Sequence, residues 1–286
     1  MEKVNDITIR KQYPREKDYI VWEYEDSFNT MYVYKDFIEK GQLQKWNERN
    51  FPSTVKQLQI RRKNETDLPA CTYDFPNLEY LLISPQLIKK IDWSHFKNLI
   101  ALETEKLNWT MKDEIFPNLL YLCVLQGSIK FKQKNLPKLR SIICKYTDEV
   151  MNELLSYRRL DNIIFYAVND TNVLDQLSGL EDLNHLKINS GKITSLEGIS
   201  KIKGVEHLQL ATLSHLTDVS ELVAMDSLQA LWINTCKYIS NWDFLLEMKS
   251  LKKLSLFGCG KNRSPFRYFL YFLSTLRIPK FENPVV

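Results

Sequence analysis

The feature that most constrains this chain is a short apolar pattern, L-x-x-L-x-L, which recurs ten times between residues 55 and 256. Ile, Val, Tyr, Cys or Thr replaces Leu at some of its apolar positions. The pattern begins at Val55, Leu78, Leu99, Leu119, Leu139, Ile163, Leu183, Val205, Leu228 and Leu251, so that successive copies lie 20 to 24 residues apart. A sustained period of this length is typical of proteins that stack one small structural unit many times.

A second periodic position supports the repeat. The residue three places before each copy is large and apolar in nine of the ten copies, and two copies share the string Phe-Pro-Asn-Leu, at 75–78 and 116–119. Each copy predicts a short strand whose fourth and sixth residues point inward, because side chains alternate along a strand. One repeat cannot bury these residues alone, so neighbouring repeats must stack into a parallel sheet over a shared core.

The stretch LEDLNHLKINSGKITSLEGI, residues 180–199, closely resembles the 22-residue repeat of bacterial internalins. The resemblance covers about residues 51–260 and is sharpest over 160–257. It implies an α/β fold, a leucine-rich-repeat solenoid with a curved parallel sheet on the concave face and helices and turns on the convex face. The Asn that is usual at repeat position nine is replaced in several repeats, by Gly127, Thr147, Thr171, Gly191, Cys236 and Cys259.

The ends of a solenoid expose its core and need caps. We expect residues 1–50 to form an N-terminal cap of strands and a helix over 36–50, with strands 19–24 and 31–34 paired as a hairpin. An alternative is that this region is a small functional module. Residues 51–260 form the solenoid of about ten repeats, with helical segments over 148–155, 218–225 and 242–248. We expect residues 261–286 to form a C-terminal cap with a helix over 266–276. An alternative interpretation is that this helix binds a membrane surface.

Composition excludes several classes of protein. The formal net charge of +4 over 286 residues, without a concentrated basic stripe, argues against nucleic-acid binding. No apolar run is long enough to span a bilayer, and the polar first 15 residues do not read as a secretion signal. Five cysteines at irregular spacing, without a Cys-x-x-Cys pair, suit reduced thiols in a cytoplasm. We therefore expect a cytoplasmic bacterial protein, monomeric and without a membrane partner.

Motifs that carry catalysis are missing from the sequence. The chain contains no phosphate-binding glycine loop, no Gly-x-Ser-x-Gly and no His-Glu-x-x-His. We therefore expect no enzyme activity, no catalytic residues, no cofactor and no metal. His185 and His207 share repeat position three in adjacent repeats and should lie side by side. The pair is interpreted as a polar contact surface, with a metal site or a pH-sensitive contact as alternatives.

The cysteines fall at distinct repeat positions. Cys123 occupies an outward slot and is expected to be the most reactive thiol, whereas Cys144 occupies an inward slot. Cys236 and Cys259 both stand at position nine, where a thiol can bond to the backbone of the loop as Asn does. We assign these two residues a structural role.

Positions three, five and seven of each repeat should point away from the core, on what we call the outward face. Large apolar patches on a surface mark interaction sites, and Tyr and Trp are frequent anchors. We expect a protein partner there, centred on Tyr80, Tyr121 and Phe165 with Trp232 as a second anchor. The full set of predicted contact residues is Tyr80, Leu82, Glu103, Glu105, Tyr121, Ile143, Phe165, His185, Lys187, His207, Trp232 and Phe257.

Two alternatives to this binding face remain at this stage. A helix or loop of the chain itself is an alternative cover for part of the apolar patch. An enzyme or small-ligand binder, with a site in the N-terminal 50 residues or at the His185 and His207 pair, is the alternative function. As a protein-binding module, the chain would serve as an immunity protein that clamps a toxin, or as a scaffold or regulator.

Overall fold

The computed structural model describes the strands at 2–4, 7–11, 20–23, 30–33 and 57–60, residue 73, and residues 75–259. The predicted cap helices over 36–50 and 266–276 lie outside the described residues. Two compact units, residues 1–166 and 167–286, divide the chain, and their boundary falls inside strand β12 (Asn162–Val168). Each unit is described by itself.

The first unit begins with a small antiparallel sheet of β1 (Glu2–Val4), β2 (Ile7–Lys11) and β3 (Ile20–Glu23). Strand β4 (Thr30–Val33) does not pair with β3. It pairs in parallel with β5 (Gln57–Ile60), with Met31 opposite Leu58. The predicted hairpin of strands 19–24 and 31–34 is therefore wrong. The physical reason is in the sequence, since Phe28-x-x-Met31-x-Val33 is itself a copy of the apolar pattern.

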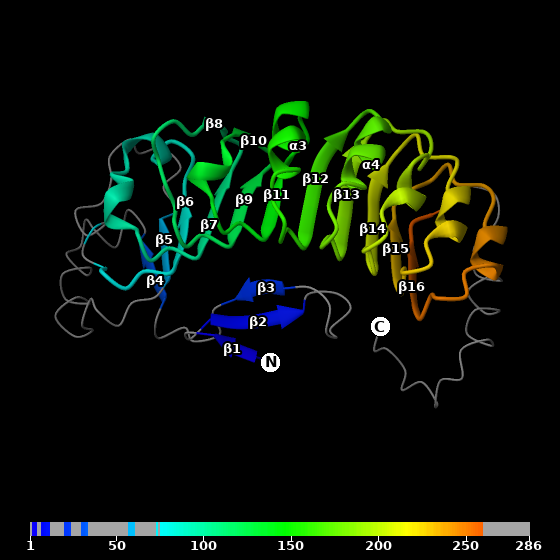
Figure 1. Cartoon of the computed structure of the whole chain (residues 1–286), viewed down its shortest axis with the longest axis horizontal. Coiled ribbons are helices and arrows are strands. Elements are labelled where there is room, and N and C mark those ends of the chain that lie inside the picture. The colour runs from blue at the N-terminus through cyan, green and yellow to red at the C-terminus, as the bar shows by residue number, and fades with distance from the viewer. Residues whose placement is uncertain are drawn as a thin grey trace. The chain divides into compact units, whose positions relative to one another are not determined.

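The repeat strands of the first unit are parallel and pair in chain order (Figure 1). After β5 they are β6 (Tyr80–Ile83), β7 (Ala101–Glu105), β9 (Tyr121–Leu125), β11 (Ser141–Lys145) and β12. Each strand begins at position three of a repeat, and the position-four residues Leu81, Leu102, Leu122 and Ile142 are fully buried. Adjacent inward side chains therefore form the continuous core that the repeat predicts.

Short elements complete the other side of these repeats. A second, two-stranded parallel sheet is formed by β8 (Asn108–Thr110) and β10 (Ser128–Lys130). The helices are the 3₁₀ segments η4 (Ile88–Lys90), η5 (Trp93–His95) and η6 (Gln133–Asn135), and the α-helix α3 (Asp148–Leu154). The predicted helix over 148–155 is thus confirmed. It begins after Thr147, whose hydroxyl accepts a hydrogen bond from the Val150 amide at 3.2 Å.

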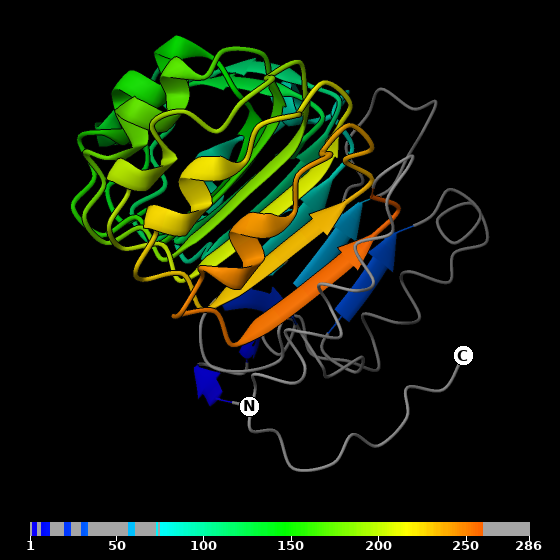
Figure 2. The same ribbon diagram turned by 90° about the vertical axis from the view of Figure 1, so that its right-hand side faces the viewer.

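The second unit repeats the arrangement. Its parallel strands are β13 (His185–Gly191), β14 (His207–Leu213), β15 (Ala230–Asn234) and β16 (Lys253–Phe257). Helix α4 (Asn172–Leu177) and the 3₁₀ segments η7 (Ile199–Lys201), η8 (Ser220–Ala224) and η9 (Asp243–Leu246) lie on one side of these strands (Figure 2). The helices predicted over 218–225 and 242–248 are therefore shorter 3₁₀ segments. Leu186 and Ile188 are buried inward residues, as predicted.

The described repeats turn around their strands in a similar way. The apolar residue three places before the pattern is buried, and in six repeats its carbonyl accepts a hydrogen bond from the first residue, as in Leu78 N to Phe75 O at 3.3 Å. After the strand, position eight adopts a left-handed conformation in most described repeats, at Lys106, Gln126, Ala167, Ser190, Thr212, Thr235 and Gly258. Both units are therefore built of leucine-rich repeats.

The register of one repeat differs from the sequence prediction. Ile163 pairs with Ile142, a position-four residue, so the repeat begins at Leu160 and not at Ile163. Phe165 is consequently an inward residue with none of its surface exposed. The prediction that Phe165 points outward and anchors a partner is wrong, because the true register places Ile164 and Tyr166 in the outward slots.

Candidate protein-binding face

An apolar cluster lies on the outward face of the first unit. Its members are Tyr80, Ala101, Tyr121 and Cys123, which come from β6, β7 and β9 and are buried. Partly buried apolar residues pack against them, among them Leu82, Leu125 and Ile143. On β12 the outward residues Ile164 and Tyr166 are buried and half-buried. The outward face therefore continues as an apolar surface across these strands.

Tyr121 is almost completely buried on the outward face. Its neighbours across the two flanking strands are Ala101 and Ser141, both too small to shield a tyrosine ring. Yet Tyr121 is only 6% exposed. Burial raises the pKa of Tyr121 well above its ordinary value, and the nearby charge of Glu103 adds to the increase. The phenol is therefore neutral, and its ring lies in an apolar setting.

Cys123 differs from the sequence prediction in its environment. It does occupy an outward slot between Glu103 and Ile143, but only 6% of its surface is exposed. Burial, together with the Glu103 carboxylate, raises the pKa of the thiol from 9.0 to about 12. The outward slot of Cys123 is therefore not an exposed one, and a thiol that is both buried and protonated is a poor nucleophile. The predicted order of thiol reactivity stays a prediction.

Three other cysteines, Cys144, Cys236 and Cys259, lie where the repeat pattern predicts. Cys144 is an inward residue and fully buried. The Cys236 thiol donates to the carbonyls of Leu210 and Asn234, at 3.8 and 3.6 Å. The Cys259 thiol likewise lies 3.2 Å from the carbonyls of Ile233 and Phe257. The thiols at position nine therefore bond to the loop backbone, which confirms the structural role predicted from the repeat.

Charged residues lie along the margin of the apolar cluster. Glu103 is half-buried on β7, and Glu105 is exposed at the end of the same strand. Lys145 is exposed at the corresponding position of β11. Tyr80, Leu82, Glu103, Glu105, Tyr121 and Ile143 are thus placed together by the fold, on neighbouring strands of one face, with an apolar centre and a charged margin.

In the second unit, His185 and His207 lie side by side on β13 and β14, as predicted from the repeat. Both are buried, and the ring of His207 stacks on Trp232 with centroids 6.1 Å apart. Burial, with His207 and Lys187 nearby, holds the pKa of His185 well below its ordinary value. The imidazole of His185 is therefore neutral at physiological pH.

The other predicted residues of the second unit differ in exposure. Lys187 is half-buried beside His185 on β13, and burial lowers its pKa. Phe257 is 71% exposed at the end of β16. Among the described residues no group of three or more His, Cys, Asp and Glu side chains is arranged to hold a metal ion, so no third ligand joins the His185 and His207 pair there.

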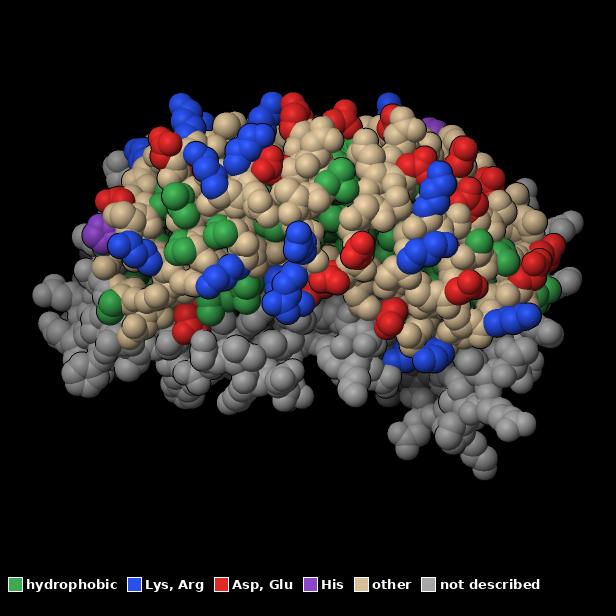
Figure 3. Space-filling model, viewed as in Figure 1, with side chains coloured by type: hydrophobic (Ala, Val, Ile, Leu, Met, Phe, Trp, Pro, Cys, Tyr) green, Lys and Arg blue, Asp and Glu red, His purple; other side chains and the backbone are tan. Residues whose placement is uncertain are grey.

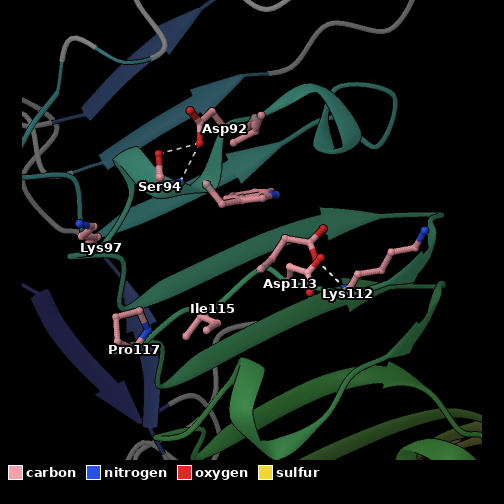
Figure 4. Close-up of a pocket in the computed structure, with 10 residues that line it drawn as sticks. Asp92, Ser94, Lys97, Lys112, Asp113, Ile115 and Pro117 are labelled. Carbon is pink, nitrogen blue, oxygen red and sulfur yellow. Dashed lines mark hydrogen bonds between the residues drawn. The ribbon is translucent and has the colours of Figure 1, made fainter.

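A shallow pocket of about 660 Å³ lies on another surface of the first unit, between residues 91–97 and 112–117 (Figure 4). Two of its three acidic residues, Asp92 and Glu114, accept hydrogen bonds within their own loops. The Asp92 carboxylate accepts hydrogen bonds from the amide and hydroxyl of Ser94, at 3.0 and 2.7 Å. The Glu114 carboxylate accepts one from the Lys112 amide at 2.6 Å. These bonds order the loops, and the lining offers no histidine or cysteine for acid–base or nucleophilic chemistry.

On the face that Figure 3 shows, the charges of the described residues are mixed. Basic and acidic side chains are interspersed over the described surface that Figure 3 shows, with small groups of hydrophobic side chains between them. A nucleic-acid binder typically gathers its basic residues into a stripe. No helix in the described part of the chain is both long and apolar enough to cross a membrane.

Comparison with solved structures finds leucine-rich-repeat proteins of low sequence identity. Internalin C2 of Listeria monocytogenes matches at 16% identity and a TM-score of 0.41, over 57% of this chain and 74% of that one. Internalin F of the same species matches at 19% identity and a TM-score of 0.43, over 67% of this chain, which spans only 58% of that one. A leucine-rich-repeat protein of Leptospira interrogans matches at 17% identity and a TM-score of 0.42, over 80% and 71%. No protein-family model and no curated protein matches the sequence.

Proposed function

We propose that this chain is a non-enzymatic protein-binding module whose partner contacts the outward face of the first unit. The observation that supports this proposal most strongly is the apolar character of that face. In a sheet with one face open to solvent, the outward positions usually hold polar residues, but here they hold Tyr80, Tyr121, Ile143 and Ile164. Apolar and aromatic surface with a polar margin is the composition of protein contact sites. Glu105 and Lys145 at the margin would set the orientation of the partner more than its affinity.

The role of the complex is a narrower proposal. One form is an immunity protein that clamps a toxin in the cytoplasm, and the other is a scaffold or regulator of a cytoplasmic enzyme. The identity of the partner separates the two. Affinity capture from the native cell with the full chain as bait, followed by purification of the captured protein, identifies the partner.

Two matched variants then locate the binding site. Ile143→Arg places a charge on the outward face, whereas Leu155→Arg places the same charge at the exposed end of α3. Binding is measured by titration calorimetry with the purified partner. We expect Ile143→Arg to weaken binding at least about 30-fold, the equivalent of about 2 kcal/mol for one anchor residue. Leu155→Arg should bind within about twofold of the parent.

The melting temperature of each variant serves as the folding control. Full affinity of a folded Ile143→Arg variant would exclude this face as the binding site. A loss in Leu155→Arg alone would move the site to the helical side of the repeats.

A further inference from the structure

The small N-terminal sheet has one apolar face. In its pairing register Ile9 lies opposite Trp22, and Ile7 lies opposite Val4. Because residues alternate between the faces of a strand, these four positions share one face with Ile20. Two charged residues, Glu2 and Lys11, lie on the same face at the outer ends of β1 and β2, opposite Ile9 and Ile20, so its centre is apolar. The other face has a different composition, being formed by Lys3, Thr8, Arg10, Val21 and Glu23.

A small sheet with an apolar face is stabilised when that face packs against other protein, because the packing removes apolar surface from water. The first unit contains both this sheet and the outward face with its buried apolar cluster. Tyr121 shows this burial most clearly, since Ala101 and Ser141 beside it cannot account for an exposure of only 6%. Cys123, which lies between Glu103 and Ile143, is equally buried.

The connection is long enough to bring the two faces together. The chain between the end of β3 at Glu23 and the start of β4 at Thr30 spans 24–29. Such a segment reaches about 20 Å when extended. From β4 to β9 the sheet order passes through β5, β6 and β7, a width of about 19 Å at about 4.8 Å per strand. The tether therefore permits the small sheet to lie over the apolar cluster.

We propose that the apolar face of the β1–β3 sheet covers the outward face of the first unit, and that a protein partner binds there by displacing it. The second part rests on the proposed function, whereas the first part is a property of the free chain. The cover shields the apolar cluster from water until a partner with a matching apolar surface replaces it. The N-terminal sheet then acts as an internal competitor that lowers the apparent affinity for the partner.

Cys123 is a native reporter of this cover. We would measure alkylation of each cysteine by N-ethylmaleimide in the full chain, with peptide mass spectrometry to separate Cys123 from Cys144. Ile9→Asp places a charge on the apolar face of the small sheet, and Thr8→Asp places the same charge on its other face. We expect Ile9→Asp to speed the alkylation of Cys123 at least about tenfold, whereas Thr8→Asp stays within about twofold of the parent.

The upper bound of the effect follows from the thiol. A return of its pKa from about 12 to the ordinary 9.0 raises the thiolate fraction at neutral pH about a thousandfold. Cys144 is fully buried in the core and should stay unreactive in both variants. Equal Cys123 rates in the parent and Ile9→Asp, or fast alkylation already in the parent, would overturn the proposal.

A rise at Cys144 in Ile9→Asp signals unfolding, and a second measurement then decides. A photoreactive phenylalanine analogue at position 9 of the otherwise unchanged full chain is crosslinked, and its adducts are mapped. Adducts within residues 80–125 support the cover, whereas adducts confined to other segments overturn it. Neither experiment needs the partner, so their failure is distinguishable from a failure of the proposed function. Displacement itself predicts that Ile9→Asp binds the purified partner more tightly than Thr8→Asp does.

Discussion

Substitution of Phe165 tests the corrected register of the repeat that begins at Leu160. Phe165 has none of its surface exposed, and its ring packs edge-on against Tyr146 with centroids 5.5 Å apart. Truncation of a buried Phe to Ala costs about 3–5 kcal/mol, which includes the lost burial and the cavity that remains. Loss of the aromatic contact adds about 1 kcal/mol at most. We therefore expect Phe165→Ala to lower the free energy of unfolding by about 4 kcal/mol.

Tyr166→Ala is the matched control, because it removes an aromatic ring from the next residue of the same strand. Tyr166 is half-buried in an outward slot, so its truncation should cost about 1 kcal/mol or a little more. Urea denaturation followed by circular dichroism measures both losses. A larger loss in Tyr166→Ala than in Phe165→Ala would show that Ile163 begins the repeat and would refute the register of β12.

Three other predictions follow from single residues. Asn135 is fully buried, and its side chain accepts a hydrogen bond from the Lys132 amide and donates to two backbone carbonyls of the preceding repeat. Asn135→Ala should therefore lower the free energy of unfolding by about 2–4 kcal/mol, as measured in urea melts. Gly191 has φ +143°, and a Cβ there would clash with a backbone carbonyl, so Gly191→Ala should lower the melting temperature far more than any surface substitution. The pKa of His185 is lowered by burial, so its stabilising effect is complete above pH 6.5 and is lost as the pH falls below 6.5. In urea melts, the free energy of unfolding should therefore be lower at about pH 5 than at about pH 7.5 by up to about 2 kcal/mol. The His185→Gln variant should show a smaller difference between the two pH values, and His215→Gln, at an exposed position, should show the same difference as the parent.

Much of the fold follows from the local sequence. The apolar pattern places nine of its ten predicted strands in register, because each strand has Leu, Ile or Val at a position that only the core can accept. The same counting places His185 beside His207 and gives Cys236 and Cys259 their common role in the loops. Short-range periodicity therefore decides which residues are neighbours along the sheet.

The failure at Phe165 has a local cause. Ile163-x-x-Tyr166-x-Val168 fits the pattern as defined, and Leu160-x-x-Ile163-x-Phe165 fits it only when Phe is also allowed at the last position, while both give spacings within the normal range. Helix α3 precedes this strand, so the spacing alone does not choose between them. The residue three places before the copy does not choose either, since it is apolar in both registers, Tyr157 before Leu160 and Leu160 before Ile163. The same error concealed Ile164 and Tyr166 from the predicted face.

The burial of the outward face has a long-range cause. The sequence pattern shows that a residue points away from the core, but it does not show whether water or another part of the chain lies over that residue. Tyr121, Cys123 and His185 were placed on the correct face of the strand, yet all three are buried. Local patterns predicted a strand at 31–34 but missed that it joins the repeat sheet, because this copy of the pattern, with Phe, Met and Val at its apolar positions, lies 27 residues before the next one.

Hydroxyl-radical footprinting of the full chain, with and without its purified partner, tests most directly whether the outward face is the binding site. Leu125, Ile143 and Tyr166 are half-buried on that face, and Ile115 and Leu155 are exposed elsewhere on the first unit. We predict that the partner strongly reduces oxidation of the first three residues in the Ile9→Asp variant, whose outward face is freed of the proposed cover, and leaves the last two unchanged. Protection of Ile115 or Leu155, with unchanged oxidation of Leu125, Ile143 and Tyr166, would contradict the proposal.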